Sequence, residues 1–164
     1  MLRLYTNYDK FDEQKVLRFN DAFFDEKVRD GPFDKTATDY MAYYDEAFII
    51  DYDTDPIKVK TKFGRSTDIT NLSTGLKTLL NILYMKQHSN GYEAVEVTEC
   101  GSNILMDIFR EARDAKIPLV LKHLSFPQFK DFAVRVDDKK LVTNKSELSV
   151  YRYSQIREDE DDEE

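Results

Sequence analysis

The sequence predicts a single α/β domain with a small mixed sheet, and an α+β arrangement is the alternative. Segments 93–98 and 117–121 have the short apolar composition of buried strands, while segment 103–115 between them has the apolar spacing of a helix. Strand, helix and strand in this order predict a parallel βαβ unit with a right-handed crossover. The length of 164 residues and the hydrophobic share of 41% suit one domain with a substantial core.

The first third of the chain mixes acidic residues with 12 of the 21 aromatic residues. Leu2 and Leu4 alternate with other side chains, which is typical of a strand with one apolar face. Gly31 and Pro32 interrupt the segment that follows, because these residues favour turns. The elements expected here are a strand at 2–5, helices near 12–28 and 37–47, and either a strand or a helix end at 48–50.

Segment 57–63 alternates apolar and basic residues and predicts a strand, which a loop at 64–70 follows. Its lysines share one face, so the stretch from Lys58 to Arg65 could track a nucleic-acid backbone. Lysines also protect edge strands against pairing with other sheets. The sequence favours this edge role, because the acidic first third and the acidic tail oppose nucleic-acid binding.

Ser73 is a good N-cap for a helix over 73–88, which ends at a glycine-containing turn. One apolar stripe of this helix should be buried, while Lys77, Asn81 and Lys86 form its polar side. The stripe is expected to contain Leu72, Leu76, Leu79, Leu80 and Leu83. The buried stripe of the helix at 103–115 is expected to contain Ile104, Leu105, Ile108, Phe109 and Ala112.

The last part of the chain predicts a hairpin, a terminal helix and an acidic tail. Segments 132–136 and 141–143 flank a charged turn and are expected to pair as a hairpin. A final helix is expected over 147–156. The last seven residues are all acidic, so the globular domain should occupy 1–156 and the tail at 157–164 should be disordered.

Charge divides the chain unequally. Residues 1–56 carry 14 acids and 7 bases, whereas residues 57–157 carry 11 acids and 17 bases. A dipolar body with an acidic end indicates electrostatic docking more than any particular reaction. We therefore expect a non-catalytic intracellular regulator or inhibitor, which binds a basic protein partner through an acidic and aromatic N-terminal surface. The candidate contact residues are Asp39, Tyr43, Tyr44, Asp45, Glu46, Asp51 and Asp53.

The chain offers little for metals, cofactors or membranes. Its single cysteine excludes an intrachain disulfide and a thiolate cluster, and favours a reducing, cytoplasmic setting. No apolar run approaches the roughly 20 residues that span a bilayer. Asp51, Asp53 and Asp55 have the spacing of a calcium loop, but Pro56 and Lys62 replace its glycine and glutamate. No metal site and no cofactor are therefore expected.

The start of the 73–88 helix resembles a phosphate loop only weakly. Gly75, Lys77 and Thr78 are present, but the first glycine of that motif is missing and Gly75 is not adjacent to the lysine. Nucleoside-triphosphate binding is therefore not expected. Free N–H groups at helix N-termini still attract other anions. The candidate anion-binding residues are Ser73, Thr74, Lys77 and Ser102.

Cys100 lies between a predicted strand and a predicted helix, at the sheet end where α/β proteins bind ligands. His123 follows the next strand and would reach the same edge. A Cys100–His123 pair oriented by Asn103 would suit nucleophilic catalysis. Single cysteines are usually inert packing residues. A small enzyme is therefore the alternative to the interaction protein.

Five short blocks occur in order along the chain. They are an opening Met-Leu-x-Leu-Tyr strand, Asp51-Tyr52-Asp53, a Leu-Ser-Thr-Gly-Leu-Lys-Thr-Leu helix start at 72–79, Cys100-Gly101-Ser102-Asn103, and Leu121-Lys122-His123. Together they resemble a family of small, functionally uncharacterised proteins of bacteria and their phages, over most of residues 1–145. The resemblance implies a shared fold and no assigned reaction. A phage-encoded anti-defence inhibitor that mimics nucleic acid is one version of the interaction protein.

Overall fold

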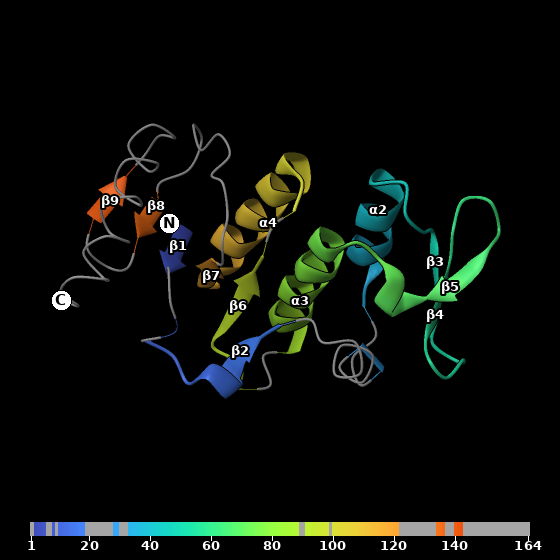
Figure 1. Cartoon of the computed structure of the whole chain (residues 1–164), viewed down its shortest axis with the longest axis horizontal. Coiled ribbons are helices and arrows are strands. Elements are labelled where there is room, and N and C mark those ends of the chain that lie inside the picture. Colours follow the sequence, from blue (N-terminus) through green and yellow to red (C-terminus); the bar gives the residue numbers. More distant parts are fainter. Residues whose placement is uncertain are drawn as a thin grey trace.

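Two sheets and three helices make up the computed structural model of the chain, within the part that it describes. A six-stranded sheet lies toward one end of the molecule and a three-stranded sheet at the other, with the helices between them (Figure 1). The protein is thus a single mixed α/β domain, as the sequence predicted. The structure describes residues 2–5, 8, 10–18, 28–29, 33–88, 91–98, 100–121, 134–136 and 140–142, with the last two ranges and Ser102 described as backbone only.

The six-stranded sheet has the order β2-β6-β7-β1-β8-β9 and is parallel except for its last strand. The predicted βαβ unit is confirmed, because β6 and β7 pair in parallel with Val95 opposite Leu119. The predicted hairpin is also confirmed as β8 and β9. The right-handed sense of the crossover stays a prediction. The strands are β1 (Leu2–Tyr5), β2 (Val16–Leu17), β6 (Ala94–Val97), β7 (Leu119–Leu121), β8 (Val134–Val136) and β9 (Lys140–Val142).

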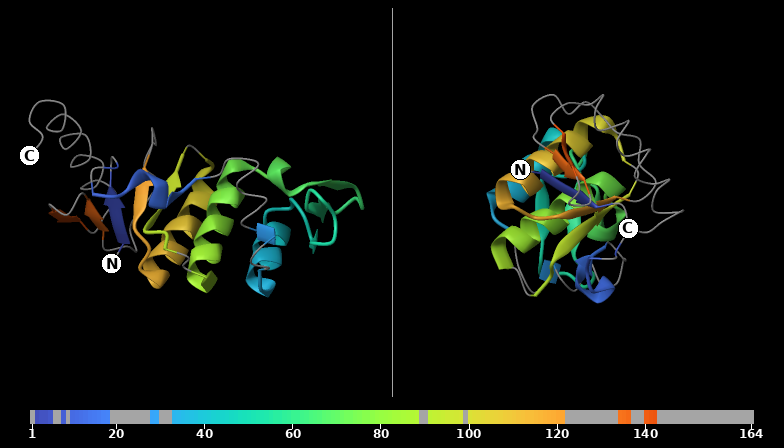
Figure 2. Two further views of the ribbon diagram at one scale, coloured as in Figure 1. Left: turned by 90° about the horizontal axis from the view of Figure 1, so that it is seen from below. Right: turned by 90° about the vertical axis from the view of Figure 1, so that its left-hand side faces the viewer.

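Helices cover one face of this sheet. α3 (Thr74–His88) and α4 (Ser102–Ala115) pack against each other, and α2 (Lys35–Tyr43) continues the row beyond α3 (Figure 2). Both predicted apolar stripes are buried, because α3 and α4 bring them against the sheet residues that face the helices. The helix-facing residues of the sheet include Leu4, Val95, Val97, Leu119 and Leu121.

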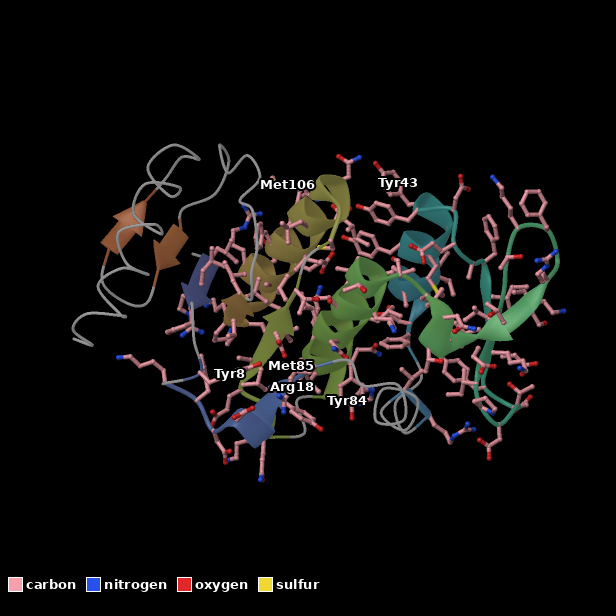
Figure 3. The ribbon with its side chains drawn as sticks, in the orientation of Figure 1. Tyr8, Arg18, Tyr43, Tyr84, Met85 and Met106 are labelled. Carbon is pink, nitrogen blue, oxygen red and sulfur yellow. The ribbon has the colours of Figure 1, made fainter. Side chains whose placement is uncertain are left out.

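The other sheet face holds a smaller apolar cluster that the segment between β1 and β2 covers. Tyr8 and Phe11 of this segment pack on Tyr5, Val16, Ala94 and Val120. The nearly buried Glu96 carboxylate also lies on this face, 3.8 Å from the guanidinium of Arg18. Figure 3 shows Tyr8 and Arg18 close to β2. Burial, and then the neighbouring Glu96 carboxylate, raise the pKa of Tyr8 to about 12.

The second sheet is antiparallel and has the order β3-β4-β5, formed by β3 (Ile49–Asp51), β4 (Lys58–Lys60) and β5 (Ser66–Asp68). Lys58 and Lys60 share its exposed side while Val59 is buried, as the alternation predicted. The edge role of these lysines is wrong, because β4 is the central strand. The loop predicted at 64–70 is wrong at 66–68, where β5 forms. The sequence of β5, Ser-Thr-Asp, is polar and carries no hydrophobic signal of a strand.

The helix expected near 12–28 is wrong over residues 12–18, whereas Val28 at its far end is helical. A 3₁₀ turn at Glu13–Lys15 leads into the two-residue strand β2, because Val16 and Leu17 become buried beside β6. The helix expected at 37–47 begins earlier, at Lys35, and ends at Tyr43. The predicted helix at 147–156 and the tail at 157–164 lie outside the described residues.

The polar side predicted for α3 is wrong at two positions. Lys77 is 7% exposed and Asn81 is 1% exposed, because neighbouring elements surround α3 on more sides than its apolar stripe covers. The Lys77 amine donates a hydrogen bond to the carbonyl of Thr70 at 2.9 Å. The amide nitrogen of Asn81 is buried without a hydrogen-bond partner in the described part of the chain.

Candidate partner-binding surface

Residues 43–46, Tyr-Tyr-Asp-Glu, form a ridge where α2 ends and the chain turns toward β3; we call it the acidic ridge. Asp34 is the N-cap of α2, and its carboxylate accepts a hydrogen bond from the N–H of Thr36. After Tyr44, Asp45 adopts a φ of 59°, a left-handed conformation that Asp tolerates better than most residues.

Two tyrosines attach α2 to α4. The hydroxyl of Tyr40 donates to the Glu111 carboxylate at 2.5 Å, and that of Tyr44 donates to Asp107. Burial first, and then these hydrogen bonds, raise the pKa of both tyrosines, so both remain donors at neutral pH. The residues of each helix are one turn apart and pair in reverse order, so α2 runs antiparallel to α4.

A first hollow of about 480 Å³ lies between α2 and α4. The ring of Tyr43 stands at its edge and is 75% exposed, on the same side of the molecule as Met106 of α4 (Figure 3). Asp39 contributes a carboxylate, which pairs with Lys35 at 2.9 Å. Aromatic rings beside carboxylates suit a cationic side chain. The hollow is lined by Thr36, Asp39, Tyr40, Tyr43, Asp107 and Arg110.

A second hollow of about 300 Å³ lies where α3 and α4 begin, and it combines residues from three separate sequence predictions. Tyr44 and Glu46 were predicted to contact a partner, Ser73 to bind an anion, and Asn103 to orient a catalytic pair. The Glu46 carboxylate accepts hydrogen bonds from the N–H and the hydroxyl of Ser73, at 2.8 and 2.6 Å. The start of α3 therefore already holds an anion from its own chain.

A third hollow of about 480 Å³ lies between the ridge and the β4–β5 turn, and is lined by residues that include Asp45, Glu46 and Phe63. The Lys62 amine is 3.4 Å from the Asp45 carboxylate and lies over the Phe63 ring, 5.6 Å from its centre. Phe63 itself is 86% exposed. The acidic ridge thus borders all three hollows.

Two strongly exposed aromatic side chains line hollows beside this ridge, Tyr43 the first and Phe63 the third. Among the described residues, the large hydrophobic side chains that are exposed are Tyr43, Phe48, Ile49 and Phe63, all within 21 positions of the sequence. Exposed apolar side chains that lie together are typical of interaction surfaces, whereas scattered ones are ordinary. This grouping therefore marks the ridge and the neighbouring sheet as the candidate surface.

Asp51 and Asp53 do not join the ridge. Asp51 ends β3 and lies opposite Lys58, while its carboxylate accepts a hydrogen bond from the N–H of Asp53. Lys58 also pairs with Asp68 at 2.8 Å. Carboxylates on both neighbouring strands therefore offset the charge of Lys58 on the face that was considered for nucleic acid.

Cys100 packs against the core beside α3. A Cβ atom added to Gly75 would lie 3.1 Å from the Cys100 Cβ, so α3 approaches this cysteine closely. Asn103 is exposed. His123 and the side chain of Ser102 lie outside the described residues, so the Cys100–His123 pair stays a prediction. Thr74 is the first residue of α3, and Lys77 is directed to Thr70.

Within the described ranges, no three His, Cys, Asp or Glu side chains converge as a metal site would require. The described helices include none with the length and apolarity to cross a membrane. Comparison of the chain with protein-family models, curated proteins and solved structures found no match.

Proposed function

We propose that this protein is a binding module that docks a basic protein partner on the acidic ridge and the adjoining β4–β5 turn. The observation that carries the proposal is the grouping of Tyr43 and Phe63, both highly exposed, on either side of Asp45. Aromatic side chains supply most of the binding energy in protein interfaces, while charges guide the approach and the orientation.

The charge of the partner follows from the segment around the ridge. Residues 1–56 carry seven more acids than bases, and the ridge contributes Asp45 and Glu46 to that excess. Lys62 and Arg65 border the same surface. The partner should therefore present cationic side chains beside apolar ones, rather than a uniformly basic face.

Some residues at this surface support the fold, whereas others are available to contact a partner. Only the second kind is suitable for substitution in a binding test. Tyr44 and Glu46 hold α4 and the start of α3, so their replacement would disturb the fold. No such internal hydrogen bond holds the side chain of Tyr43 or Phe63 in the described structure. Asp45→Asn keeps a residue type that tolerates a positive φ.

The test measures binding of a short fluorescent peptide of alternating Arg, Leu and Ser residues by polarisation, with a Glu-Leu-Ser peptide as its acidic counterpart. A variant that ends at Arg157 serves as the reference protein, because the acidic tail would bind cations unspecifically. We expect the cationic peptide to bind more tightly, and Tyr43→Ala with Phe63→Ala to weaken it at least about fivefold. Asp53→Asn, outside the ridge, is the matched control for Asp45→Asn, and it should leave the affinity unchanged.

Equal affinity for both peptides would contradict the claim that the partner is basic. Unchanged binding in the Tyr43 and Phe63 double variant would contradict the claim that the ridge is the binding surface. Light scattering of the wild-type chain must show a monomer at the concentrations used, because a dimer formed through Tyr43 and Phe63 would identify the surface as a self-contact instead.

A further inference from the structure

A basic hollow lies at the opposite ends of α3 and α4 from the acidic ridge. It occupies about 680 Å³ at the amino ends of β6, β7 and β1, where both helices finish. Its rim carries Arg3, Lys10, Lys86 and Lys116, with Glu93 as the acid that lines it. Each helix end contributes roughly half a negative charge, which leaves the cations in clear excess.

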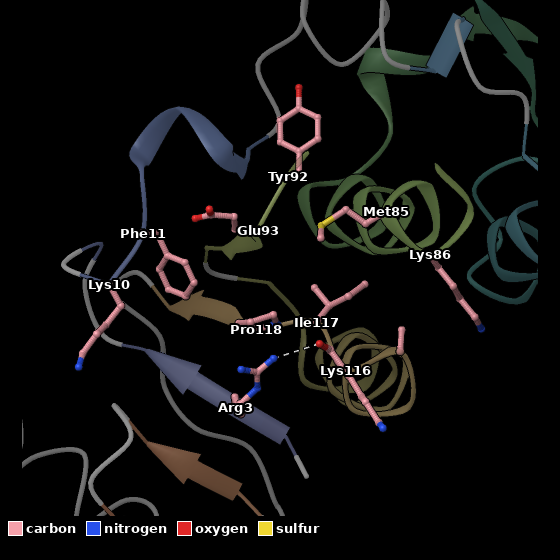
Figure 4. Close-up of a pocket in the computed structure, with 11 residues that line it drawn as sticks. Arg3, Lys10, Phe11, Met85, Lys86, Tyr92, Glu93, Lys116, Ile117 and Pro118 are labelled. Carbon is pink, nitrogen blue, oxygen red and sulfur yellow. Dashed lines mark hydrogen bonds between the residues drawn. The ribbon is translucent and has the colours of Figure 1, made fainter. Parts of the chain in front are cut away.

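Some cationic side chains around this hollow have partners within the protein, whereas others extend outward (Figure 4). The guanidinium of Arg3 donates a hydrogen bond to the carbonyl of Lys116 at 3.1 Å, and Lys86 lies 3.4 Å from Glu111. Lys10 and Lys116 extend outward from the rim, as Figure 4 shows. Between them the floor includes apolar side chains, of which Phe11 is partly buried and Ile117 is buried. An occupant should therefore combine an apolar part with several negative charges.

We propose that the acidic end of this same chain, residues 158–164, docks on the basic hollow. Seven consecutive carboxylates provide the charge, and Tyr153 and Ile156 immediately before them provide apolar groups for the floor. This pairing is independent of the partner surface proposed above, because the two regions lie at opposite ends of α3 and α4.

The strand register places the start of the tail within reach. β9 leaves the sheet at Val142, which lies opposite Val134, and Val134 lies opposite Leu2 at the amino end of the sheet. Two strand spacings amount to about 10 Å. Fifteen residues separate Val142 from Glu158 and can span up to about 55 Å, so the chain is long enough to reach Arg3 and the hollow beside it.

Zero-length carbodiimide cross-linking of the full chain, read by mass spectrometry, tests the proposal. It joins carboxylates to amines only where they meet. We expect the carboxylates of 158–164 to couple to Lys10 and Lys116 in preference to the exposed control Lys60. Salt at about 1 M, where the screening length is about 3 Å, should remove that preference.

Two variants sharpen the test. Lys10→Gln with Lys116→Asn should lower tail coupling to Lys86, the lysine that then remains in the lining, between about twofold and thirtyfold, as expected for the loss of two exposed ion pairs, whereas Lys60→Gln should not change it. Asn suits the left-handed backbone of residue 116, whose φ is 60°. Tail coupling to Lys60 that equals coupling to the rim would overturn the proposal. Coupling found only between copies, in a mixture of ¹⁵N-labelled and unlabelled protein, would overturn it as well.

Discussion

The close approach of α3 and α4 gives a quantitative prediction at Gly75. Gly75 of α3 lies against Ile104 of α4 with no room for a side chain. A Cβ atom at Gly75 would lie 2.6 Å from the Cγ2 of Ile104 and 3.1 Å from the Cβ of Cys100. Neither atom belongs to a flexible side-chain end, because Ile is stiff at χ1 in a helix.

The Gly75→Ala variant sets two effects against each other. Alanine is favoured over glycine in a helix by at most about 1 kcal/mol. Overpacking of a closed contact costs about 1–3 kcal/mol, and the rigid neighbours place this site in the upper part of that range. We therefore expect the free energy of unfolding to fall by about 1–2 kcal/mol, which corresponds to a loss of roughly 2–8 °C in Tm for a chain of this length.

Gly101→Ala is the matched control. Gly101 has a φ of −65°, and an added Cβ would meet nothing within 4 Å. The same substitution there should change stability by no more than about 0.5 kcal/mol. Urea unfolding followed by circular dichroism measures both variants. A Gly75→Ala protein as stable as the wild type would refute the packing argument, and so would equal losses in the two variants.

Three further predictions concern single side chains. Asn81→Leu should raise the free energy of unfolding by about 1 kcal/mol, because it removes a buried amide that lacks a partner; a loss of stability would mean that the amide is bonded. Glu46→Gln should lower it by about 0.5–1 kcal/mol in urea unfolding, since the charge at the start of α3 is lost, and no change would deny that contribution. The pKa of Tyr8 is about 12 in the folded state against 10.0 for the free side chain, so its protonated hydroxyl stabilises the fold below pH 10 and this contribution is lost as pH rises toward 12. The alkaline loss of stability should be smaller in Tyr8→Phe, and an identical pH profile for the two proteins would contradict this assignment.

The βαβ region was predictable because its signals are local. The stripe from Ile104 to Ala112 has helical spacing, and the apolar run at 117–121 is typical of a strand buried on both faces. Such patterns can be recognised within a short segment of sequence, and the same positions are buried in the folded protein. The strand order was not predictable in this way, because the central position of β1 depends on pairing with β7 and β8, more than 100 residues away.

The missed elements share a different cause. β2 has two residues and β5 is polar, so neither carries a pattern long enough to recognise. Lys77 and Asn81 were expected on a polar side because their burial depends on how many elements surround α3. Tertiary packing decides such positions, and no window of sequence contains it.

The candidate surface was predictable in part. The acids and aromatic residues at 39–46 were identified from composition, and five of the seven proposed contact residues line neighbouring hollows. The exposed Phe63 was not identified, since only the return of β4 toward the ridge brings it near Asp45. Glu46 was expected to face a partner, yet it caps the start of α3.

An amide chemical-shift map of the ¹⁵N-labelled full chain, titrated with the Arg-Leu-Ser peptide, locates the peptide on the molecule. Docking on the acidic ridge should shift the amides of residues 39–46 and 61–65 saturably, and these shifts should disappear in the Tyr43→Ala and Phe63→Ala double variant. Shifts confined to residues 158–164, with the ridge amides unmoved, would contradict the account.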